Sequence, residues 1–471
     1  GMYSDPRIVY REYIQNSVDS IENAVAEGLM SNEDAYIKVF IDAENGCISI
    51  IDNGKGISVA RATNVLLSIG KSTKRQDANR GFRGIGRLGG LSYCERLSFT
   101  TSVQGEDVAT RIIFDCKLLK SLLSPDHEEE LDLQSVIERI TEVEEIDADK
   151  DDHFFRVDMD EVDSSSELLD LDEIKQYLSE VAPVPYDERH FVVAPEIKRF
   201  LNEHDYTLTE FKIFIGYDED HLKQVHKPNR YRFQSDRNQR TEDVITEVVT
   251  FSIDLDSTSS LLGWYGRCHW NGTLSDNGLL GMRMRLGNIL IGDRRTMDVM
   301  FKEPRFNGWV QGEIFVNTTG LIPNARRDDF EQNEVYYQMI EKLKARVGDV
   351  ITREIREASK TRNNPDARLL REVTRVTEKV DKMVDEGLYS QKDKEQLGEE
   401  LRDAEKKLTR ISQRSPQLAE EKRVASTRLA SVQEKVDTTT NYKINSEISS
   451  EIDKKQKKIL RLVFETLSEY L

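Results

Sequence analysis

Hydrophobic residues in the first part of the chain follow two different spacings. Between residues 11 and 28 they recur every three or four positions, which predicts an amphipathic helix. Residues 119–152 include the acidic stretch HEEELDLQSVIERITEVEEIDADKDD, whose apolar positions also keep a helical spacing and predict a solvated helix. Shorter apolar runs lie between loops that contain glycine, and we expect strands at Tyr36–Ile41, Cys47–Ile51, Arg96–Ser102, Val108–Asp115 and His153–Met159. This alternation predicts an α+β domain over residues 2–165.

The remaining chain divides into two regions of different composition. Residues 166–358 contain all three tryptophans and strand-like runs such as LLGWYGRCHW, so we expect a middle α/β domain there. Residues 359–471 are highly charged, and Pro365 and Pro416 argue against one continuous rod. Apolar residues at four- and three-residue steps predict a helical hairpin or coiled coil in this last region, and they are Leu369, Val373, Val376, Val380 and Met383, then Leu397, Leu401, Leu408 and Ile411.

Charge and composition restrict the functions that fit the chain. The formal net charge is −19, so the chain repels nucleic acid on average, although a local basic patch can still bind it. The apolar runs are too short to cross a bilayer, and the start lacks the pattern of a signal peptide. Widely separated cysteines suit reduced thiols better than a disulfide framework or a zinc site. We therefore expect a cytoplasmic protein.

The first candidate site lies on the helix expected at residues 11–28. Glu12, Asn16 and Asp19 are spaced i, i+4 and i+7, so they fall on one stripe of that helix, opposite an apolar stripe. A carboxylate next to a carboxamide suits a base that activates water beside a magnesium ligand. Taken alone, such a stripe is more often the wet side of an ordinary surface helix. Gly28 is a suitable C-terminal stop.

An aspartate follows the second expected strand. The segment CISIIDNGKGIS leads from apolar strand residues directly to Asp52, Gly54, Gly56 and Ile57. A carboxylate at a strand end can accept a hydrogen bond from an amino group such as that of adenine, and glycines let the backbone approach a flat ring. The same residues fit an Asn-Gly turn between two elements, and the segment alone does not separate the two interpretations.

Residues 69–91 form a glycine-rich, basic segment. Five glycines fall between Gly81 and Gly90 and alternate with arginines, and Lys71 precedes them. Backbone N–H groups in such a segment, with the start of a following helix, can surround phosphates, which a flexible linker would not require. No GxxxxGKS or GxxxxGKT pattern occurs, which excludes a Walker-type loop. Gly84 and Gly86 do not follow the first strand of a βαβ unit, as a Rossmann site requires.

These three motifs, in this order between residues 12 and 91, resemble the GHKL class of ATP-binding proteins (gyrase, heat-shock chaperone, histidine kinase, MutL). The resemblance implies a Bergerat-type α/β sandwich that holds ATP between helices and an antiparallel sheet. Within that class, MYSDPRIVYREYIQNSVDS and SIGKSTK are similar to segments of the bacterial heat-shock protein 90 family. The resemblance covers residues 2–358 in outline and is strong in the first hundred.

The resemblance implies a role for each candidate position. Glu12 would be the base that orients the attacking water, and Asn16 would ligate Mg²⁺. Asp52 would bind the adenine amino group, and the glycine-rich segment would contact phosphates or form a lid. The implied nucleotide contacts are Asn16, Asp19, Asp52, Gly54, Gly56, Ile57, Lys71, Gly81, Phe82, Arg83, Gly84, Ile85 and Gly86.

A fourth segment, GEIFVNTTGLIPNARRDDFEQN, resembles the part of the chaperones' middle domain that supplies a positive charge to the nucleotide. Aligning Asn324 and Arg327 with that part makes Arg327 the candidate for the γ-phosphate, with Arg326 as the alternative. An arginine there would neutralise charge on the transferred phosphoryl group. A surface ion pair of Arg327 with Asp328 or Asp329 would also account for these residues.

Two features depart from the family pattern. The family ends its nucleotide sheet with a Gly-Thr pair that completes the adenine pocket. The matching strand here, DDHFFRVDMD, has His153 and Phe154 near that place and no threonine. The C-terminal third does not resemble the chaperones' dimerisation domain.

The resulting hypothesis is a Mg²⁺-dependent ATPase of the chaperone kind. It would act as an ATP-driven conformational clamp whose helical tail pairs with a second copy or a protein client. Two alternatives stay open. A DNA-associated clamp of the MutL or MORC type would share GFRG at residues 81–84, and a module that senses nucleotide without hydrolysis would explain the missing threonine. A histidine kinase fits least, because that group lacks a base like Glu12.

Overall fold

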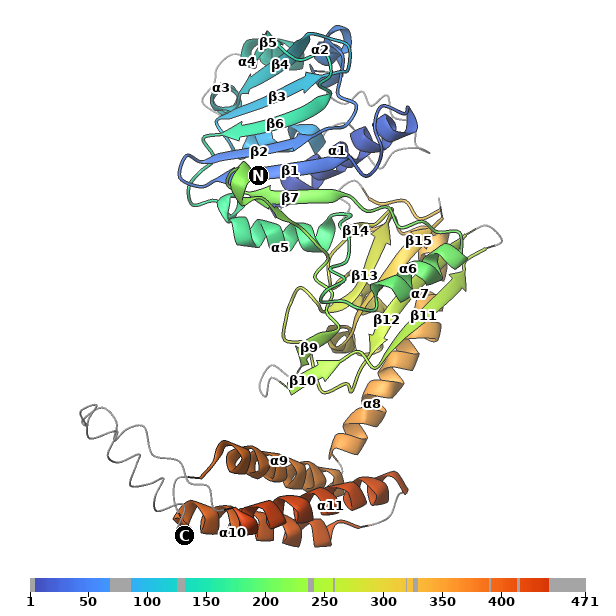
Figure 1. Ribbon diagram of the computed structural model, residues 1–471. Coiled ribbons are helices and arrows are strands. Elements are labelled where there is room, and N and C mark those ends of the chain that lie inside the picture. The colour runs from blue at the N-terminus through green and yellow to red at the C-terminus, as the bar shows by residue number, and fades with distance from the viewer. Residues whose placement is uncertain are drawn as a thin grey trace, which may run out of the picture. The chain divides into compact units, whose positions relative to one another are not determined.

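The computed structural model describes most of the chain and divides it into two compact units, Gly1–Ile355 and Arg356–Leu471 (Figure 1). The described residues are 5–67, 86–124, 132–235, 241–256, 259–318, 320–324, 329–363, 365–388, 391–412 and 416–439.

The first unit begins with an eight-stranded sheet in the order β5-β4-β3-β6-β2-β1-β7-β8 (Figure 1). Neighbouring strands are antiparallel except for the parallel pair β1 and β7. In β1 and β2 every second residue is buried, which is the period that the sequence shows. The strands are β1 (Tyr36–Asp42), β2 (Cys47–Asp52), β3 (Arg96–Ser102), β4 (Val108–Asp115), β5 (Thr141–Asp147), β6 (Phe154–Asp160), β7 (Lys212–Gly216) and β8 (Lys223–Gln224).

The five strands expected from the sequence are therefore confirmed as β1, β2, β3, β4 and β6, with ends that differ by at most one residue. Two further strands of the sheet, β7 and β8, come from residues that the sequence analysis assigns to the middle region. The mixed, largely antiparallel sheet with helices beside it agrees with the expected α+β fold.

Four helical segments pack near this sheet, namely α1 (Ile8–Ala26), α2 (Val59–Leu67), the 3₁₀ helix η1 (Gly86–Ser92) and α3 (Cys116–Leu122). A fifth, α5 (Leu171–Val181), contacts β7 on one side and α1 on another. The helix α1 ends at Ala26, and Gly28 follows with a φ of 73°, a left-handed conformation that glycine adopts readily. One hydrophobic core joins α1, the sheet and α5, which fixes α1 in place on two sides.

The acidic stretch 127–152 differs from the single helix that its apolar spacing predicts. It follows α3 (Cys116–Leu122), and its described residues form α4 (Leu133–Ile140) and then the edge strand β5. The prediction is wrong for β5, because pairing with β4 satisfies the strand's backbone groups while its acidic side chains stay at the edge in water. The apolar residues of β5, Val143 and Ile146, are three positions apart, which fits a helix, so spacing alone does not reveal the strand.

The second sheet of the first unit has five strands in the order β11-β12-β15-β13-β14, and a short ribbon pairs β9 with β10 (Figure 1). The strands of the sheet are β11 (Glu247–Asp254), β12 (Ser260–Arg267), β13 (Gly281–Leu286), β14 (Ile289–Ile291) and β15 (Gln311–Asn317), and those of the ribbon are β9 (Arg232–Ser235) and β10 (Thr241–Val244). The expected strand-like run LLGWYGRCHW contributes most of β12. The helical segments here are η2 (Glu167–Leu169), α6 (Ala194–Glu203), η3 (Glu219–His221), η4 (Thr296–Met300), η5 (Pro304–Trp309), α7 (Glu334–Leu343), the π-helical turn η6 (Lys344–Gly348) and α8 (Asp349–Asn363).

Among the described residues of the second unit, three helices pack against one another, α9 (Pro365–Glu386), α10 (Gln391–Arg410) and α11 (Pro416–Thr438). The two prolines that the sequence marks as interruptions each begin a helix, a position that proline tolerates because no N–H is needed there. Met383 is 39% exposed, so its predicted place in the seam is wrong. The other seam residues lie in or against two clusters that α11 completes, and they are Leu369, Val373, Val376, Val380, Leu397, Leu401, Leu408 and Ile411.

None of the helices in the described part of the chain combines the length and hydropathy of a membrane-spanning segment.

Candidate functional site

The helix α1 carries the first candidate residues. Glu12 and Asn16 are half-buried and lie one turn apart, while Asp19 is buried with 4% exposure. The apolar stripe opposite them is buried in the core that joins α1 to the sheet, as the sequence predicts. The structure therefore keeps a carboxylate and a carboxamide together at a partly open position of an otherwise fixed helix.

A second side of α1 is also buried, which the amphipathic pattern does not predict. The Tyr10 hydroxyl donates to the carbonyl oxygen of Leu168 at 2.7 Å, and the Arg11 guanidinium donates to the carbonyl oxygen of Leu290. Both acceptors belong to residues beyond 165, so the middle region covers a polar side of this helix. The solvent-exposed side of α1 is therefore narrower than the sequence predicts.

Asp52 ends strand β2 and is 1% exposed. Its Oδ1 accepts a hydrogen bond from the Gly54 N–H at 2.9 Å, and its Oδ2 makes no hydrogen bond with the described residues. Burial raises the pKa of Asp52 from 3.8 to about 7, although the nearby Ser17, Gly54 and Ser20 groups oppose the rise. A buried carboxylate oxygen without a partner is costly, and a ligand that donates a hydrogen bond would remove that cost.

The turn after Asp52 lies too close to its neighbours to carry a side chain at Gly54 or Gly56. A Cβ on Gly54 would come within 2.3 Å of Ser20 Oγ on α1, and a Cβ on Gly56 would come within 1.9 Å of the carbonyl oxygen of Ser102. Gly56 also has a φ of 68°, which favours glycine. The backbone N–H of Lys55 donates to the Ser20 carbonyl oxygen at 3.3 Å, so the turn is joined to α1 directly.

Two side chains hold the other side of this turn, Thr101, which the sequence analysis missed, and His153, which it placed near the expected adenine pocket. Thr101 Oγ1 on β3 accepts from the Ile57 N–H at 2.8 Å and donates to the Phe154 carbonyl oxygen at 3.0 Å. His153 Nδ1 lies 2.8 Å from the Gly54 carbonyl oxygen and acts as the donor there, because a carbonyl can only accept. The sequence contains no local pattern that pairs Thr101 with Ile57, since the contact depends on the sheet order.

The strand register identifies the residue opposite Asp52. Within the antiparallel pair β2 and β6, Asp52 faces Phe155. An aromatic residue, Phe155, therefore lies beside the place where the family has its threonine. The side-chain hydroxyls near the Asp52 carboxylate belong to Ser17 and Ser20 of α1.

Most of the glycine-rich segment lies outside the described residues. Lys71, Gly81, Phe82, Arg83, Gly84 and Ile85 lie outside the described residues. Gly86 is described and is the first residue of η1, which packs on α1. The end of this segment therefore contacts the helix that carries Glu12 and Asn16.

Arg326 and Arg327 also lie outside the described residues. The residues on either side of them are held together, because the Asn324 N–H donates to the Asp329 carbonyl oxygen at 2.9 Å and Pro323 pairs with Phe330 in an antiparallel bridge.

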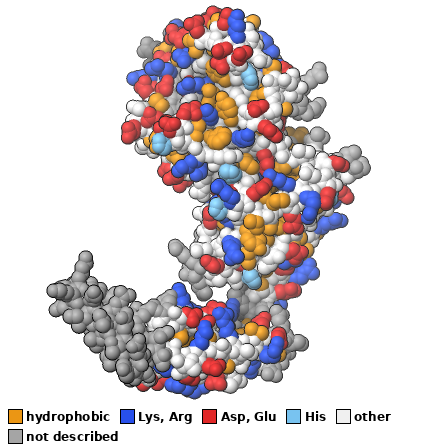
Figure 2. Space-filling model, in the orientation of Figure 1, with side chains coloured by type: hydrophobic (Ala, Val, Ile, Leu, Met, Phe, Trp, Pro, Cys, Tyr) orange, Lys and Arg blue, Asp and Glu red, His pale blue; other side chains and the backbone are white. Residues whose placement is uncertain are grey.

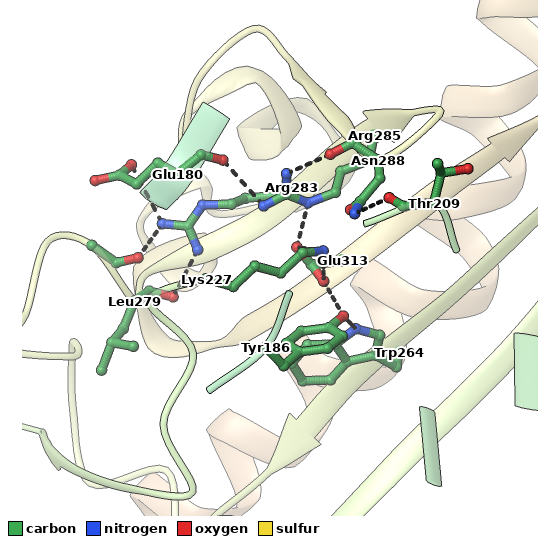
Figure 3. Close-up of polar contacts among 11 residues, drawn as sticks. Glu180, Tyr186, Thr209, Lys227, Trp264, Leu279, Arg283, Arg285, Asn288 and Glu313 are labelled. Carbon is green, nitrogen blue, oxygen red and sulfur yellow. Dashed lines mark hydrogen bonds and ion pairs between the residues drawn. The ribbon is translucent and has the colours of Figure 1, made fainter. Parts of the chain in front are cut away.

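A buried cluster of charges in the five-stranded sheet was not expected from the sequence (Figure 3). Glu313 on β15 is fully buried and accepts from Lys227 Nζ at 3.1 Å, from the Arg285 guanidinium and from the Tyr186 hydroxyl. Trp264 Nε1 donates to the Tyr186 oxygen at 3.2 Å. Burial alone would raise the pKa of Glu313, but Arg285 and Lys227 hold it below its usual value. Both oxygens of the Glu313 carboxylate already accept hydrogen bonds from these side chains, so we assign the cluster a structural role.

The cluster predicts a large loss of stability on Glu313→Gln. The substitution keeps the shape but leaves Lys227 and Arg285 buried without their anion, so the free energy of unfolding should fall by about 3–5 kcal/mol. Urea unfolding followed by circular dichroism measures this change. Glu219→Gln is the control, because Glu219 pairs with Lys38 at an exposed position and should cost less than about 1 kcal/mol. Equal losses in the two variants would contradict the assigned role.

The first region of the chain also matches known proteins. Residues 3–147 match the family described as "Histidine kinase-, DNA gyrase B-, and HSP90-like ATPase". The chaperone protein HtpG of Nitrosomonas europaea is 31% identical over 123 residues, which amount to 22% of this chain. The match covers 19% of the relative, so the chain spans about a fifth of that protein's length.

Proposed function

We propose that this chain, whose N-terminal region is a GHKL-type ATPase domain resembling the heat-shock protein 90 family, binds ATP with Mg²⁺, hydrolyses it slowly and works as a chaperone-like conformational clamp. The observation that carries the proposal is the buried carboxylate of Asp52, which has one oxygen without a partner among the described residues. It stands beside a turn in which Gly54 and Gly56 have no room for a side chain. The HtpG relative is named as a chaperone, and its match includes only a small part of either protein.

Each residue of the site has a proposed task. Asp52 Oδ2 accepts from the adenine amino group, and Gly54, Gly56 and Ile57 border the ring. The donor set also fits a magnesium ion, since the half-buried Asn16 offers an amide oxygen, a ligand that Mg²⁺ accepts. When bound, that ion would neutralise phosphate charge. Glu12, one turn before Asn16, orients the attacking water and takes its proton.

The remaining contacts are proposed for the phosphates. Asp19 lies next to Asn16 on α1, and Gly86 begins the segment that packs on this helix. Arg327 neutralises charge on the γ-phosphate, with Arg326 as the alternative. The other proposed phosphate contacts are Lys71, Gly81, Phe82, Arg83, Gly84 and Ile85.

We further propose a clamp built from an ATP-binding domain (2–165), a middle domain (166–358) and a helical region (359–471) in a cytoplasmic protein. The contact between Arg11 on α1 and the carbonyl oxygen of Leu290 supports communication between the first two parts. In the helical region the apolar seam is covered by helices of the same unit. A second copy or a protein client would therefore bind other faces of this unit.

A nucleotide sensor without hydrolysis is the second candidate, and the position of Phe155 opposite Asp52 favours it. A DNA clamp receives less support. The formal net charge is −19, and Figure 2 shows acidic and basic side chains interspersed over the described surface in view.

Titration of MgATP and MgADP by calorimetry, with phosphate release followed in the same samples, tests the proposal. We expect both nucleotides to bind and ATP to be hydrolysed slowly. Binding without phosphate release would support the sensor. Failure of both nucleotides to bind would contradict the proposal.

A further inference from the structure

The peptide groups at Gly90 connect η1 to the helix α1. The Gly90 N–H donates to the Tyr13 hydroxyl oxygen at 3.1 Å. The Gly90 carbonyl oxygen accepts from the Tyr93 N–H at 2.9 Å and from the Cys94 thiol at 3.3 Å. Tyr13 is 2% exposed, so its hydrogen bond with Gly90 is shielded from water. This contact therefore fixes the last part of η1 against α1.

Only glycine fits at this contact. A Cβ on Gly90 would lie 2.5 Å from the Tyr13 hydroxyl oxygen, whereas the next atoms, Leu97 Cδ1 and Met159 Sδ, would be 3.1 and 3.4 Å away. The last two belong to flexible apolar side chains that can move by the small amount needed. The Tyr13 hydroxyl is therefore the atom that sets how closely η1 approaches α1.

The two elements joined in this way carry different parts of the proposed site. Tyr13 directly follows Glu12 on α1, and η1 begins at Gly86, a proposed phosphate contact. A shift of α1 relative to η1 would change the position of the Glu12 carboxylate relative to the bound phosphates. Displacements of about 1 Å between reacting groups can cost about 100-fold in rate.

We propose that Tyr13 is a positioning residue for ATP hydrolysis, because its hydrogen bond to Gly90 sets α1, and with it Glu12, relative to the phosphate-binding end of η1. The inference rests on the proposed function. Tyr13 itself touches neither nucleotide nor water in this role, and it acts through the placement of the two backbone segments.

The chain supplies a matched control for a purely structural role. Tyr10 lies three residues earlier on the same helix and is 1% exposed. Its hydroxyl donates to the Leu168 carbonyl oxygen at 2.7 Å, away from η1. Tyr10→Phe and Tyr13→Phe each remove one buried hydroxyl from α1 and keep the ring. They should cost similar stability, but only Tyr13→Phe loosens η1.

The experiment measures kcat for ATP hydrolysis, Kd for MgADP and amide hydrogen exchange in both variants. In Tyr13→Phe we expect kcat to fall about tenfold, Kd to stay within about twofold, and exchange at Gly90 to rise about tenfold or more. In Tyr10→Phe all three should stay within about twofold of the parent. Equal kcat values in the two variants would overturn the proposal, whatever their melting temperatures.

A second substitution tests the contact from its other side. Gly90→Ala should also lower kcat, because its Cβ collides with the Tyr13 hydroxyl. Combining it with Tyr13→Phe removes that collision, so the double variant should hydrolyse ATP faster than Gly90→Ala alone. A double variant slower than both single variants would contradict the proposed geometry. A parent protein that binds no nucleotide overturns the proposed function and the catalytic role together. A parent that hydrolyses ATP, with Tyr13→Phe unchanged, overturns only this inference.

Discussion

Replacing Glu12 with alanine should lower the rate of ATP hydrolysis by at least about 100-fold and leave nucleotide binding in place, the range expected for the loss of a positioned general base. Glu12 is half-buried, so its carboxylate is held by α1 and still open to water and ligand. The residues proposed to bind adenine and the phosphates are unchanged in this variant, so nucleotide binding should persist. Phosphate release and calorimetry on the same samples measure the two effects.

Glu22→Gln is the matched control for this prediction. Glu22 is a half-buried carboxylate on the same helix, ten positions further along and on a different side of it. Its replacement should change hydrolysis by less than about threefold. If Glu12→Ala hydrolyses ATP as fast as the parent protein, the assigned mechanism is wrong. If binding is lost as well, Glu12 has a structural role that the proposed mechanism does not include.

Local spacing in the sequence was sufficient for most of the sheet and for the helix α1. Strands such as β1 and β2 bury alternate residues against one core, so the period of two in the sequence corresponds to a physical face. The glycines at 54 and 56 were also informative, because the close approach of backbone to α1 and β3 excludes any side chain there. These features depend on neighbours in sequence, where the pattern is visible.

Features that depend on distant partners could not be predicted in the same way. The strand β5 resembles a helix in its apolar spacing, and only its pairing with β4 determines its conformation. The buried Glu313 gives no indication of its burial in the sequence, since its cationic partners Lys227 and Arg285 lie in other segments. Tyr13 was not singled out in the sequence, because its role depends on where η1 is packed.

The site prediction was limited in the same manner. The sequence correctly placed Asp52 at a buried strand end. The residues that hold the turn after Asp52 come from β3 and from the position just before β6, and the sequence does not show that they meet there. The sequence shows that the strand DDHFFRVDMD lacks the family's threonine, whereas only the strand register shows that Phe155 lies opposite Asp52. In the helical unit, Met383 shows that a heptad position can face solvent when the third helix α11 covers another side.

Asp52→Asn should weaken MgADP binding by at least about 100-fold, because a neutral amide replaces a charge-assisted acceptor in a buried position. Calorimetry measures the change. Asp42→Asn is the control, since Asp42 ends the neighbouring strand β1 at the surface and should leave Kd within about twofold of the parent. An Asp52→Asn protein that binds MgADP as tightly as the parent would contradict the proposed contact between Asp52 and adenine.

The raised pKa of Asp52 adds a pH dependence whose direction is fixed. Adenine binding needs the carboxylate, and with a pKa of about 7 its ionised fraction falls from about 0.9 at pH 8 to about 0.1 at pH 6. The Kd for adenosine, which carries no phosphate to titrate, should therefore rise about tenfold as the pH falls from 8 to 6.

The stability of the ligand-free protein changes with pH in the opposite sense. The folded state retains a proton that the unfolded chain releases near pH 4, so this contribution to stability is lost as the pH rises through 7. Because Asp52→Asn cannot titrate at this position, a parent protein whose stability has the same pH profile as that variant would show that Asp52 is not the titrating group.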